Sequence, residues 1–113
     1  MIKFRKLAID IARLAYQKKC KNIVILDVRK LTSICDYFVI ITITSDTQLN
    51  AVYDTIIKSY SSKLSLLSKT RDISPHWRVL DYVGVIVHLM MPTVRKFYSL
   101  ERIWYKAKKI KFK

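Results

Sequence analysis

The sequence contains a single glycine, Gly84, among its 113 residues, together with only two prolines. The dinucleotide-binding fingerprint and the phosphate-binding P-loop each need several glycines, because only a missing side chain lets backbone amides approach the phosphates. Both motifs are therefore excluded. Acidic residues are also few, and no Asp-x-Asp or Asp-x-Glu pair occurs, so neighbouring carboxylates that could hold catalytic metal ions are absent. We expect no metal-dependent phosphoryl transfer and no bound cofactor.

Soft metal ligands are equally scarce. They comprise Cys20, Cys35, His76 and His88, and their scattered spacing lacks the paired ligands of a zinc site. Two cysteines are too few for a disulfide framework, so we expect both to be reduced and the compartment to be reducing. Cys35 and His88 could form a nucleophilic pair only if the fold brought them together. The apolar neighbours of His88 favour a hydrogen-bonded histidine within a sheet instead.

Long apolar runs are missing too. None approaches the roughly 18 residues needed to cross a bilayer, and the longest candidate, 83–91, contains His88 and stops at Pro92. The basic N-terminus resembles a signal peptide, but Asp10 and Arg13 interrupt its apolar part. We predict a structural helix there, no membrane partner and a cytoplasmic location, with a transit peptide as the alternative.

Positive charge is in excess. The chain has 22 lysines and arginines against 8 acidic residues, a formal net charge of +14. Such an imbalance indicates a polyanionic environment such as nucleic acid, although it does not identify the partner. The lysines also lie far apart, at 18–21 and in the tail at 106–113, so a solvated surface or the composition of an A+T-rich genome are alternative explanations.

Helical periodicity predicts three helices. The first spans residues 3–19. The second follows a capping box formed by Ser45 and Gln48 and continues to Leu64. The third spans 92–104, where the apolar residues occupy two faces, so we expect some aromatic side chains to remain exposed.

Four apolar, β-branched runs predict strands, at residues 22–28, 36–44, 77–82 and 85–91. The first two are joined by about seven residues, too few for a parallel crossover, so they should pair antiparallel. Val83 and Gly84 suit a tight hairpin turn between the last two. The pattern does not decide whether KLSLL at 63–67 is a strand or a loop. The prediction is one α/β domain over residues 1–113, a mixed β-sheet flanked by helices, with a basic C-terminal tail at 106–113.

Three segments carry distinctive motifs: NIVILDVRKLTSICDYFVIITITS at 22–45, HWRVLDYVGVIVHLM at 76–90 and RKFYSLERIW at 95–104. In order and spacing they resemble the ribosomal silencing factor (Iojap-related) family. The combination of DYF, W-x-x-x-D and R-x-x-Y-x-L-E-x-x-W is specific, whereas each motif alone is weak. The resemblance covers nearly the whole chain, apart from the first few residues, the 61–75 stretch and the basic tail.

This resemblance implies a mixed sheet flanked by helices, related to nucleotidyltransferases but without their active-site acids. It also implies a translational repressor that catalyses nothing. Family members are understood to bind ribosomal protein number fourteen of the large ribosomal subunit and to block the small subunit sterically, during nutrient limitation or late assembly. Contact with nearby ribosomal RNA and a homodimer of the free protein are further expectations.

The resemblance places the candidate partner-binding residues on the last two strands and the third helix. They are Trp77, Leu80, Asp81, Tyr82, His88, Met90, Arg95, Tyr98 and Glu101. Core packing is the alternative for Trp77, Leu80 and Tyr98, whereas Arg95 is expected to be an anchor with no core role. We expect Asp36 and Tyr37 to close the sheet edge, and Trp104 to pack in the core.

The chain also departs from the family pattern. Ile43 stands where the family usually has Gly, and Val85 where it usually has Asp. The Glu-Gly pair expected before Trp77 is missing, with Thr70 and Arg71 near that place. Two other functions therefore remain open: a general RNA-binding domain that uses the basic surface and exposed aromatics, and a nucleotidyltransferase relative with residual activity.

Overall fold

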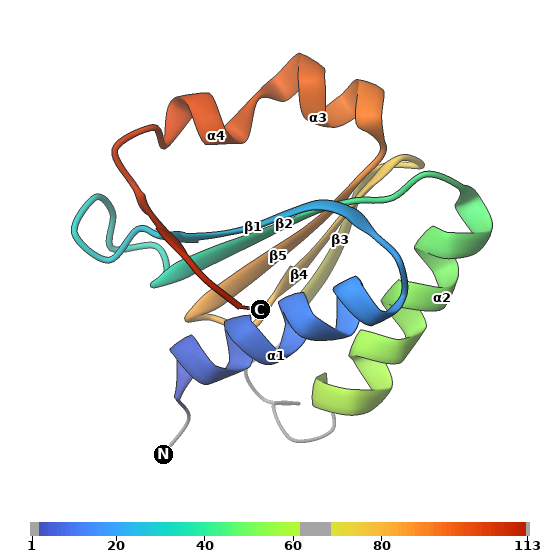
Figure 1. Cartoon of the computed structure of the whole chain (residues 1–113), viewed down its shortest axis with the longest axis horizontal. Coiled ribbons are helices and arrows are strands. Elements are labelled where there is room, and N and C mark those ends of the chain that lie inside the picture. The colour runs from blue at the N-terminus through green and yellow to red at the C-terminus, as the bar shows by residue number, and fades with distance from the viewer. Residues whose placement is uncertain (1–2, 62–68, 113) are drawn as a thin grey trace.

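A six-stranded β-sheet carries helices on both of its faces in the computed structural model, which describes residues 3–61 and 69–112 (Figure 1). The elements are α1 (Phe4–Gln17), β1 (Lys21–Asp27), β2 (Tyr37–Thr42), α2 (Asp46–Ile56) with a π-helical turn η1 (Ile57–Ser61), β3 (Lys69–Ser74), β4 (Trp77–Asp81), β5 (Val85–Met90), α3 (Pro92–Tyr98), α4 (Leu100–Ile103) and β6 (Lys108–Ile110). This arrangement confirms the predicted α/β fold with a mixed sheet flanked by helices.

The strand order is β3-β4-β5-β2-β1-β6. The central pair, β2 and β5, is parallel, and every other neighbouring pair is antiparallel, including the predicted pairing of β1 with β2. All six residues of β2 are buried, because helices cover both faces of the sheet at its centre. A continuous β-branched and aromatic run is the expected sequence of such a strand.

Two apolar cores lie on opposite faces of the sheet. Side chains alternate between them along each strand, so that Val39 faces the core under α1 and α2 while Ile40 faces the core under α3 and α4. Helix α1 contributes three alanines to the first core, which let the helix lie close to the sheet. The second core receives Val94, Leu100 and Trp104 from the C-terminal segment.

The predicted capping box at the start of α2 is present with a one-residue shift. The hydroxyl of Ser45 accepts a hydrogen bond from the Gln48 amide at 3.1 Å, and the Gln48 side chain accepts one from the Thr44 amide at 2.9 Å. The Gln48 side-chain amide also donates to the Lys18 carbonyl at 3.2 Å. The cap therefore joins the end of α1 to the start of α2.

The predicted hairpin between β4 and β5 is confirmed, but the residue in the left-handed region is Val83, with φ of 69°. The carboxylate of Asp81 accepts a hydrogen bond from the Val83 amide at 2.8 Å and so holds this turn. Gly84 is needed for a different reason, because a Cβ atom there would overlap the ring of Phe4. The glycine thus allows the start of α1 to pack on the hairpin.

The structure corrects four predictions. The third helix is interrupted at Ser99, which has φ of 47°, and so forms α3 and α4. The basic tail contributes a strand, β6, and residues 69–74 form another at the opposite edge, which the pattern did not reveal. Tyr37 is buried in an inner strand and does not close an edge. The second helix is α-helical only to Ile56 and continues as η1 to Ser61, while its predicted end at Leu64 and the KLSLL segment lie outside the described residues.

Within residues 3–61 and 69–112, no helix has both the length and the hydropathy needed to cross a bilayer.

Candidate partner-binding surface

Exposed apolar side chains are concentrated on α3, α4 and the residue stretch that follows. Phe97 is 80% exposed, Tyr105 74%, Ile103 64% and Tyr98 48%. These four are half of the eight large apolar residues that are exposed in the described part of the chain. We name them the α3–α4 patch. A cluster of apolar side chains that water surrounds is a common mark of a protein-binding surface.

The α3–α4 patch arises because the apolar residues of this segment outnumber the inward-facing positions. Val94, Leu100 and Trp104 pack against the sheet, and Trp104 lies 5.4 Å from the Phe38 ring centre. This confirms the prediction that Trp104 packs in the core. The remaining aromatics face outward, as the mixed periodicity predicted, and Phe97 packs edge-on against Tyr98.

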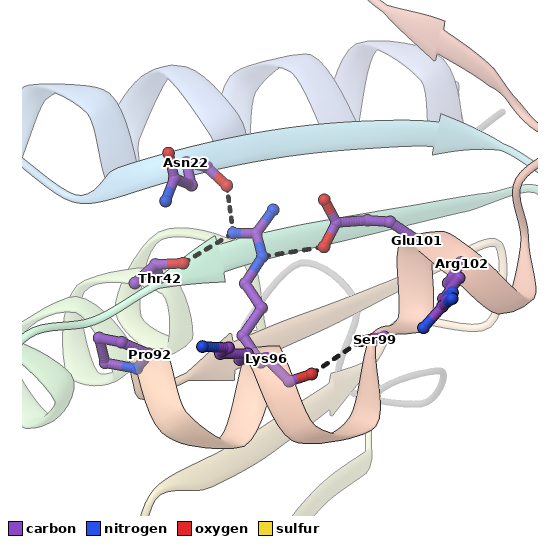
Figure 2. A pocket seen from close by; sticks show the side chains of 8 residues that line it. Asn22, Thr42, Pro92, Lys96, Ser99, Glu101 and Arg102 are labelled. Atoms are coloured by element: carbon purple, nitrogen blue, oxygen red, sulfur yellow. Dashed lines mark hydrogen bonds and ion pairs between the residues drawn. The ribbon is translucent and has the colours of Figure 1, made fainter.

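A single arginine holds α3 and α4 against the sheet. Arg95 is only 9% exposed, and its guanidinium donates hydrogen bonds to the Thr42 hydroxyl at 2.8 Å, to the Asn22 carbonyl and to the Glu101 carboxylate at 3.0 Å. Figure 2 shows Asn22, Thr42 and Glu101 converging on this group from three elements. The break at Ser99 makes this possible, because it turns α4 so that Glu101 faces back toward α3.

Arg95 therefore has a structural role, and the prediction that it has no core role is wrong. Its guanidinium offers donors in a planar fork, which suits simultaneous bonding to a carbonyl, a hydroxyl and a carboxylate. An open hollow of about 380 Å³ lies beside it. Its lining comprises Asn22, Thr42, Pro92, Arg95, Lys96, Ser99, Glu101 and Arg102. Lys96 and Arg102 are exposed at this hollow, so it could accept a polar group of a partner.

A second link between the sheet and α3 is aromatic. The Trp77 indole nitrogen donates to His88 Nδ1 at 3.1 Å, and the Trp77 and Tyr98 ring centres are 4.7 Å apart. Since an indole can only donate, His88 Nδ1 must be unprotonated. Burial lowers the pKa of His88 to about 4, which agrees with a neutral ring. His88 is thus the hydrogen-bonded sheet histidine that its apolar neighbours predicted.

The nine predicted contact residues do not form one surface. Tyr98 is exposed, and Asp81 and Glu101 are half-buried. Three others are buried between the sheet and the C-terminal helices: Trp77, His88 and Arg95. Leu80, Tyr82 and Met90 are each 0% exposed, which corrects their assignment as contacts. Leu80 and Tyr82 belong to the core under α1 and α2, on the opposite face of the sheet from α3 and α4.

The most exposed members of the α3–α4 patch are absent from the contacts predicted from the sequence. Phe97, Ile103 and Tyr105 were not among the predicted contacts, although the presence of apolar residues on two faces of one helix was the signal for them.

The structure also shows where two of the departures from the family pattern lie. Ile43 and Val85 are both 0% exposed in the core under α1 and α2, so neither side chain lies on the surface.

Both cysteines are buried free thiols, as predicted. Burial raises the pKa of Cys20 to about 11 and that of Cys35 to about 12, so neither is a thiolate near neutral pH. Cys35 lies near the Tyr37 carbonyl at 3.6 Å, while His88 is bonded to Trp77, so the two do not form a nucleophilic pair. The described residues contain no group of three or more His, Cys, Asp or Glu side chains placed to hold a metal ion.

Comparison with known proteins agrees with this geometry. The family model described as "Ribosomal silencing factor during starvation" matches residues 2–113. A ribosomal silencing factor from Chromobacterium violaceum is 30% identical over 100 residues, covering 84% of this chain and 82% of the relative. The chloroplastic protein Iojap of Zea mays is 31% identical over 101 residues, which are 88% of this chain but only 44% of that protein.

Solved structures show the same fold. A crystal structure of a Chromobacterium violaceum protein superposes with a TM-score of 0.80 and 25% identity, covering 98% of this chain and 92% of the other. A Bacillus halodurans crystal structure has a TM-score of 0.66 at 20% identity, covering 90% and 94%. With a family model that spans almost every residue and relatives that share the fold, this chain belongs to the ribosomal silencing factor (RsfS, Iojap-related) family.

Proposed function

We propose that this chain binds ribosomal protein number fourteen of the large ribosomal subunit and prevents the small subunit from joining. The observation that carries the proposal is the α3–α4 patch, which presents Phe97 and Ile103 to solvent from the 95–104 segment that carries a family motif. Arg95 and Trp77 hold this segment in one position, so the patch is formed before a partner arrives. Such preorganisation lowers the entropic cost of binding.

Steric obstruction requires only that the chain stay bound on the face where the subunits meet. The protein measures 33 × 32 × 27 Å, so even its smallest dimension greatly exceeds the few ångströms that separate contacting surfaces. A standard interface buries about 800 Å² per partner and depends on a few aromatic anchors, which the α3–α4 patch can supply. The proposed mechanism therefore needs no catalytic step.

The names of the relatives support the ribosomal setting. Several bacterial relatives are ribosomal silencing factors, and a mouse relative, 29% identical over 95 residues, is named "Mitochondrial assembly of ribosomal large subunit protein 1". Family membership thus indicates association with the large subunit. Ribosomal protein number fourteen as the docking point, the block of subunit joining, a role in late assembly and action in the cytoplasm are parts of our proposal.

Light scattering during subunit joining tests the proposal. Large subunits are preincubated with the chain and then mixed with small subunits. We expect the chain to suppress the rise in scattering, and the double variant Phe97→Ser with Ile103→Ser to need at least about tenfold more protein, since loss of a hot-spot side chain costs more than about 1 kcal/mol.

The matched control is Tyr16→Ser with Ile34→Ser, which also removes one aromatic and one isoleucine side chain, 53% and 70% exposed, from other parts of the surface. This control should inhibit like the parent chain. Unimpeded joining with the parent chain, or equal loss in both double variants, would contradict the proposal. Sedimentation equilibrium of the free chain and the patch variant also tests the predicted homodimer, which should dissociate when the α3–α4 patch is altered.

A further inference from the structure

A second surface of distinct character lies where α1 begins, β1 ends and β6 begins (Figure 1). It is a hollow of about 320 Å³, which we name the basic basin. Its lining comprises Arg5, Asp27, Arg29, Lys30, Leu31, Lys106, Lys108 and Ile110. Five cationic side chains thus surround one carboxylate. The pairing of Asp27 with Lys108 in the β1–β6 register places the C-terminal segment beside the end of β1, and Arg5 of α1 lines the same hollow.

The single carboxylate in the basic basin is already neutralised. Asp27 accepts hydrogen bonds from Arg29 Nε at 3.0 Å and from the terminal guanidinium nitrogen at 2.8 Å. This bidentate bonding to Arg29 lowers the pKa of Asp27, so the carboxylate stays ionised. One cation is consumed by this pair. Arg5 also acts on Asp27 through its charge, but the hydrogen bonds to this carboxylate within the described residues all come from Arg29, so the basin keeps a surplus of positive charge.

These four cations, Arg5, Lys30, Lys106 and Lys108, form no hydrogen bond or ion pair with any residue in the described part of the chain. All four are exposed. Arg5 lies in α1 and Lys108 in β6, while Lys30 and Lys106 lie in the turns after β1 and before β6. Like charges gathered in this way repel one another and raise the local concentration of anions. The sequence alone did not show that Arg5 and Lys30 are neighbours of the C-terminal lysines.

The form of the basin suits a chain of phosphates better than one small anion. Its cationic side chains are exposed, whereas a single small anion is normally held by converging, buried donors. Lys109 in β6 and Lys111 directly after it add positive charge beside the basin but do not line it. Tyr105 is 74% exposed next to Lys106, whose Nζ is 5.9 Å from its ring centre. Cations spaced along a groove with an exposed aromatic ring are typical of surfaces that bind single-stranded nucleic acid.

We propose that the basic basin binds the phosphate backbone of an RNA strand, and that Tyr105 stacks on one of its bases. The choice of RNA rests on the proposed function, since ribosomal RNA is the polyanion beside a protein docked on the large subunit. The RNA-binding surface shares Tyr105 with the α3–α4 patch but uses neither Phe97 nor Ile103, so protein docking and RNA contact can be tested separately. RNA contact would orient the bound chain and add affinity by a second attachment.

The test measures fluorescence anisotropy of a labelled single-stranded RNA of about 16 nucleotides with the full chain. The basin variant combines Arg5→Gln, Lys30→Gln and Lys108→Gln. The matched control combines Lys18→Gln, Lys21→Gln and Lys58→Gln, three exposed lysines outside the basin. Both variants lose three positive charges from the +14 chain, so any general effect of net charge is equal.

We expect the basin variant to bind the RNA at least about tenfold more weakly at about 50 mM salt, and its plot of log affinity against log salt to be less steep by about 2. The control should change affinity less than about threefold. Equal losses in the two triple variants would overturn the proposal in favour of diffuse attraction. Loss of binding to anionic phospholipid vesicles, with RNA binding unchanged, would overturn it in favour of a membrane surface.

Two crossed measurements separate this inference from the proposed function. The double variant Phe97→Ser with Ile103→Ser should retain RNA binding, and the basin variant should still obstruct subunit joining, at a somewhat higher concentration. If the parent chain fails to obstruct joining but only the basin variant loses RNA binding, only the proposed function fails. If the parent chain obstructs joining but the control variant loses RNA binding as well, only the basin proposal fails.

Discussion

The two faces of the sheet are held to their helices by different interactions. Under α1 and α2 the contact is a continuous apolar core, with many residues at 0% exposure. Under α3 and α4 it combines a smaller apolar core with directional contacts, from Arg95 to Thr42 and Glu101 and from the Trp77 ring to the Tyr98 ring. Helices of seven and four residues have little stability of their own, so these contacts decide where they lie.

This difference indicates that one face of the sheet mainly stabilises the fold and the other mainly presents the binding surface. Apolar burial is non-directional and scales with area, so the α1–α2 face supplies most of the folding energy. Hydrogen bonds require particular partners at particular angles, so the α3–α4 face is specified in position and can carry exposed aromatics without losing its geometry. We therefore expect substitutions in the core under α1 and α2 to cost the most stability, and substitutions of exposed residues on α3 and α4 to change binding.

The largest expected effect comes from Leu80→Ala. Leu80 is 0% exposed in the core under α1 and α2, and a leucine-to-alanine change at such a site costs about 3 to 4 kcal/mol. Urea unfolding should show this loss, while protein that remains folded should still obstruct subunit joining. Normal stability combined with lost obstruction would mean that Leu80 contacts the partner after all, contrary to the division between the two faces.

Acid should destabilise the packing of the sheet face under α3 and α4 through His88. The pKa of His88 is about 4 in the folded protein, below its ordinary value of 6.5, so the unfolded chain binds a proton more readily. The stability from a neutral His88 is thus complete above about pH 6.5 and is lost as the pH falls toward 4, by up to about 3 kcal/mol. Urea midpoints between pH 7 and pH 4.5 should fall.

His88→Asn is the control, because its carbonyl can still accept from Trp77 but cannot titrate. Its urea midpoint should depend less on pH over that window. The Asp27 carboxylate, whose pKa is lowered mainly by Arg29, contributes stability that is lost only below its ordinary pKa of 3.8, so it does not confound the comparison. An equal decline in both proteins would remove His88 as the cause.

Arg95→Met tests whether Arg95 acts by holding α3 in place or by touching the partner directly. The change removes the bonds to Thr42 and Glu101 while keeping an unbranched apolar stem, and we expect a loss of about 2 kcal/mol. Obstruction of subunit joining should weaken several-fold although Arg95 is buried. Lys96→Met, an exposed neighbour, is the control and should change unfolding by less than about 0.5 kcal/mol. Unchanged obstruction by Arg95→Met would show that α3 is held by its apolar contacts alone.

The smallest expected effect is on RNA binding and comes from Tyr105, which belongs to the α3–α4 patch and lies next to Lys106 of the basic basin. Tyr105→Leu keeps an apolar side chain but removes the ring, so RNA binding should weaken about fivefold or more, as expected for one stacked base. Unfolding should be nearly unchanged, since Tyr105 is exposed. Tyr105→Phe should restore RNA binding. If leucine and phenylalanine behave alike in the anisotropy measurement, Tyr105 does not stack on RNA.

Local patterns determined much of this protein. The β-branched runs predicted β1, β2, β4 and β5, helical periodicity and the capping box at Ser45 predicted α1 and α2, and three motifs indicated the family. These features rest on interactions between residues that are close in the chain, or on one face of one element. Period and propensity therefore suffice to detect them.

Only the tertiary structure decided the remainder. Lys108–Ile110 is a strand because β1 offers it unpaired backbone groups, and no pattern within three residues records that. Arg95 turns inward because Thr42, Asn22 and Glu101 come together from distant positions. Periodicity states which residues share a face, but not which faces another element will cover. The sequence by itself thus determined the elements and the family, while burial of Leu80, exposure of Phe97 and assembly of the basic basin depended on how those elements pack.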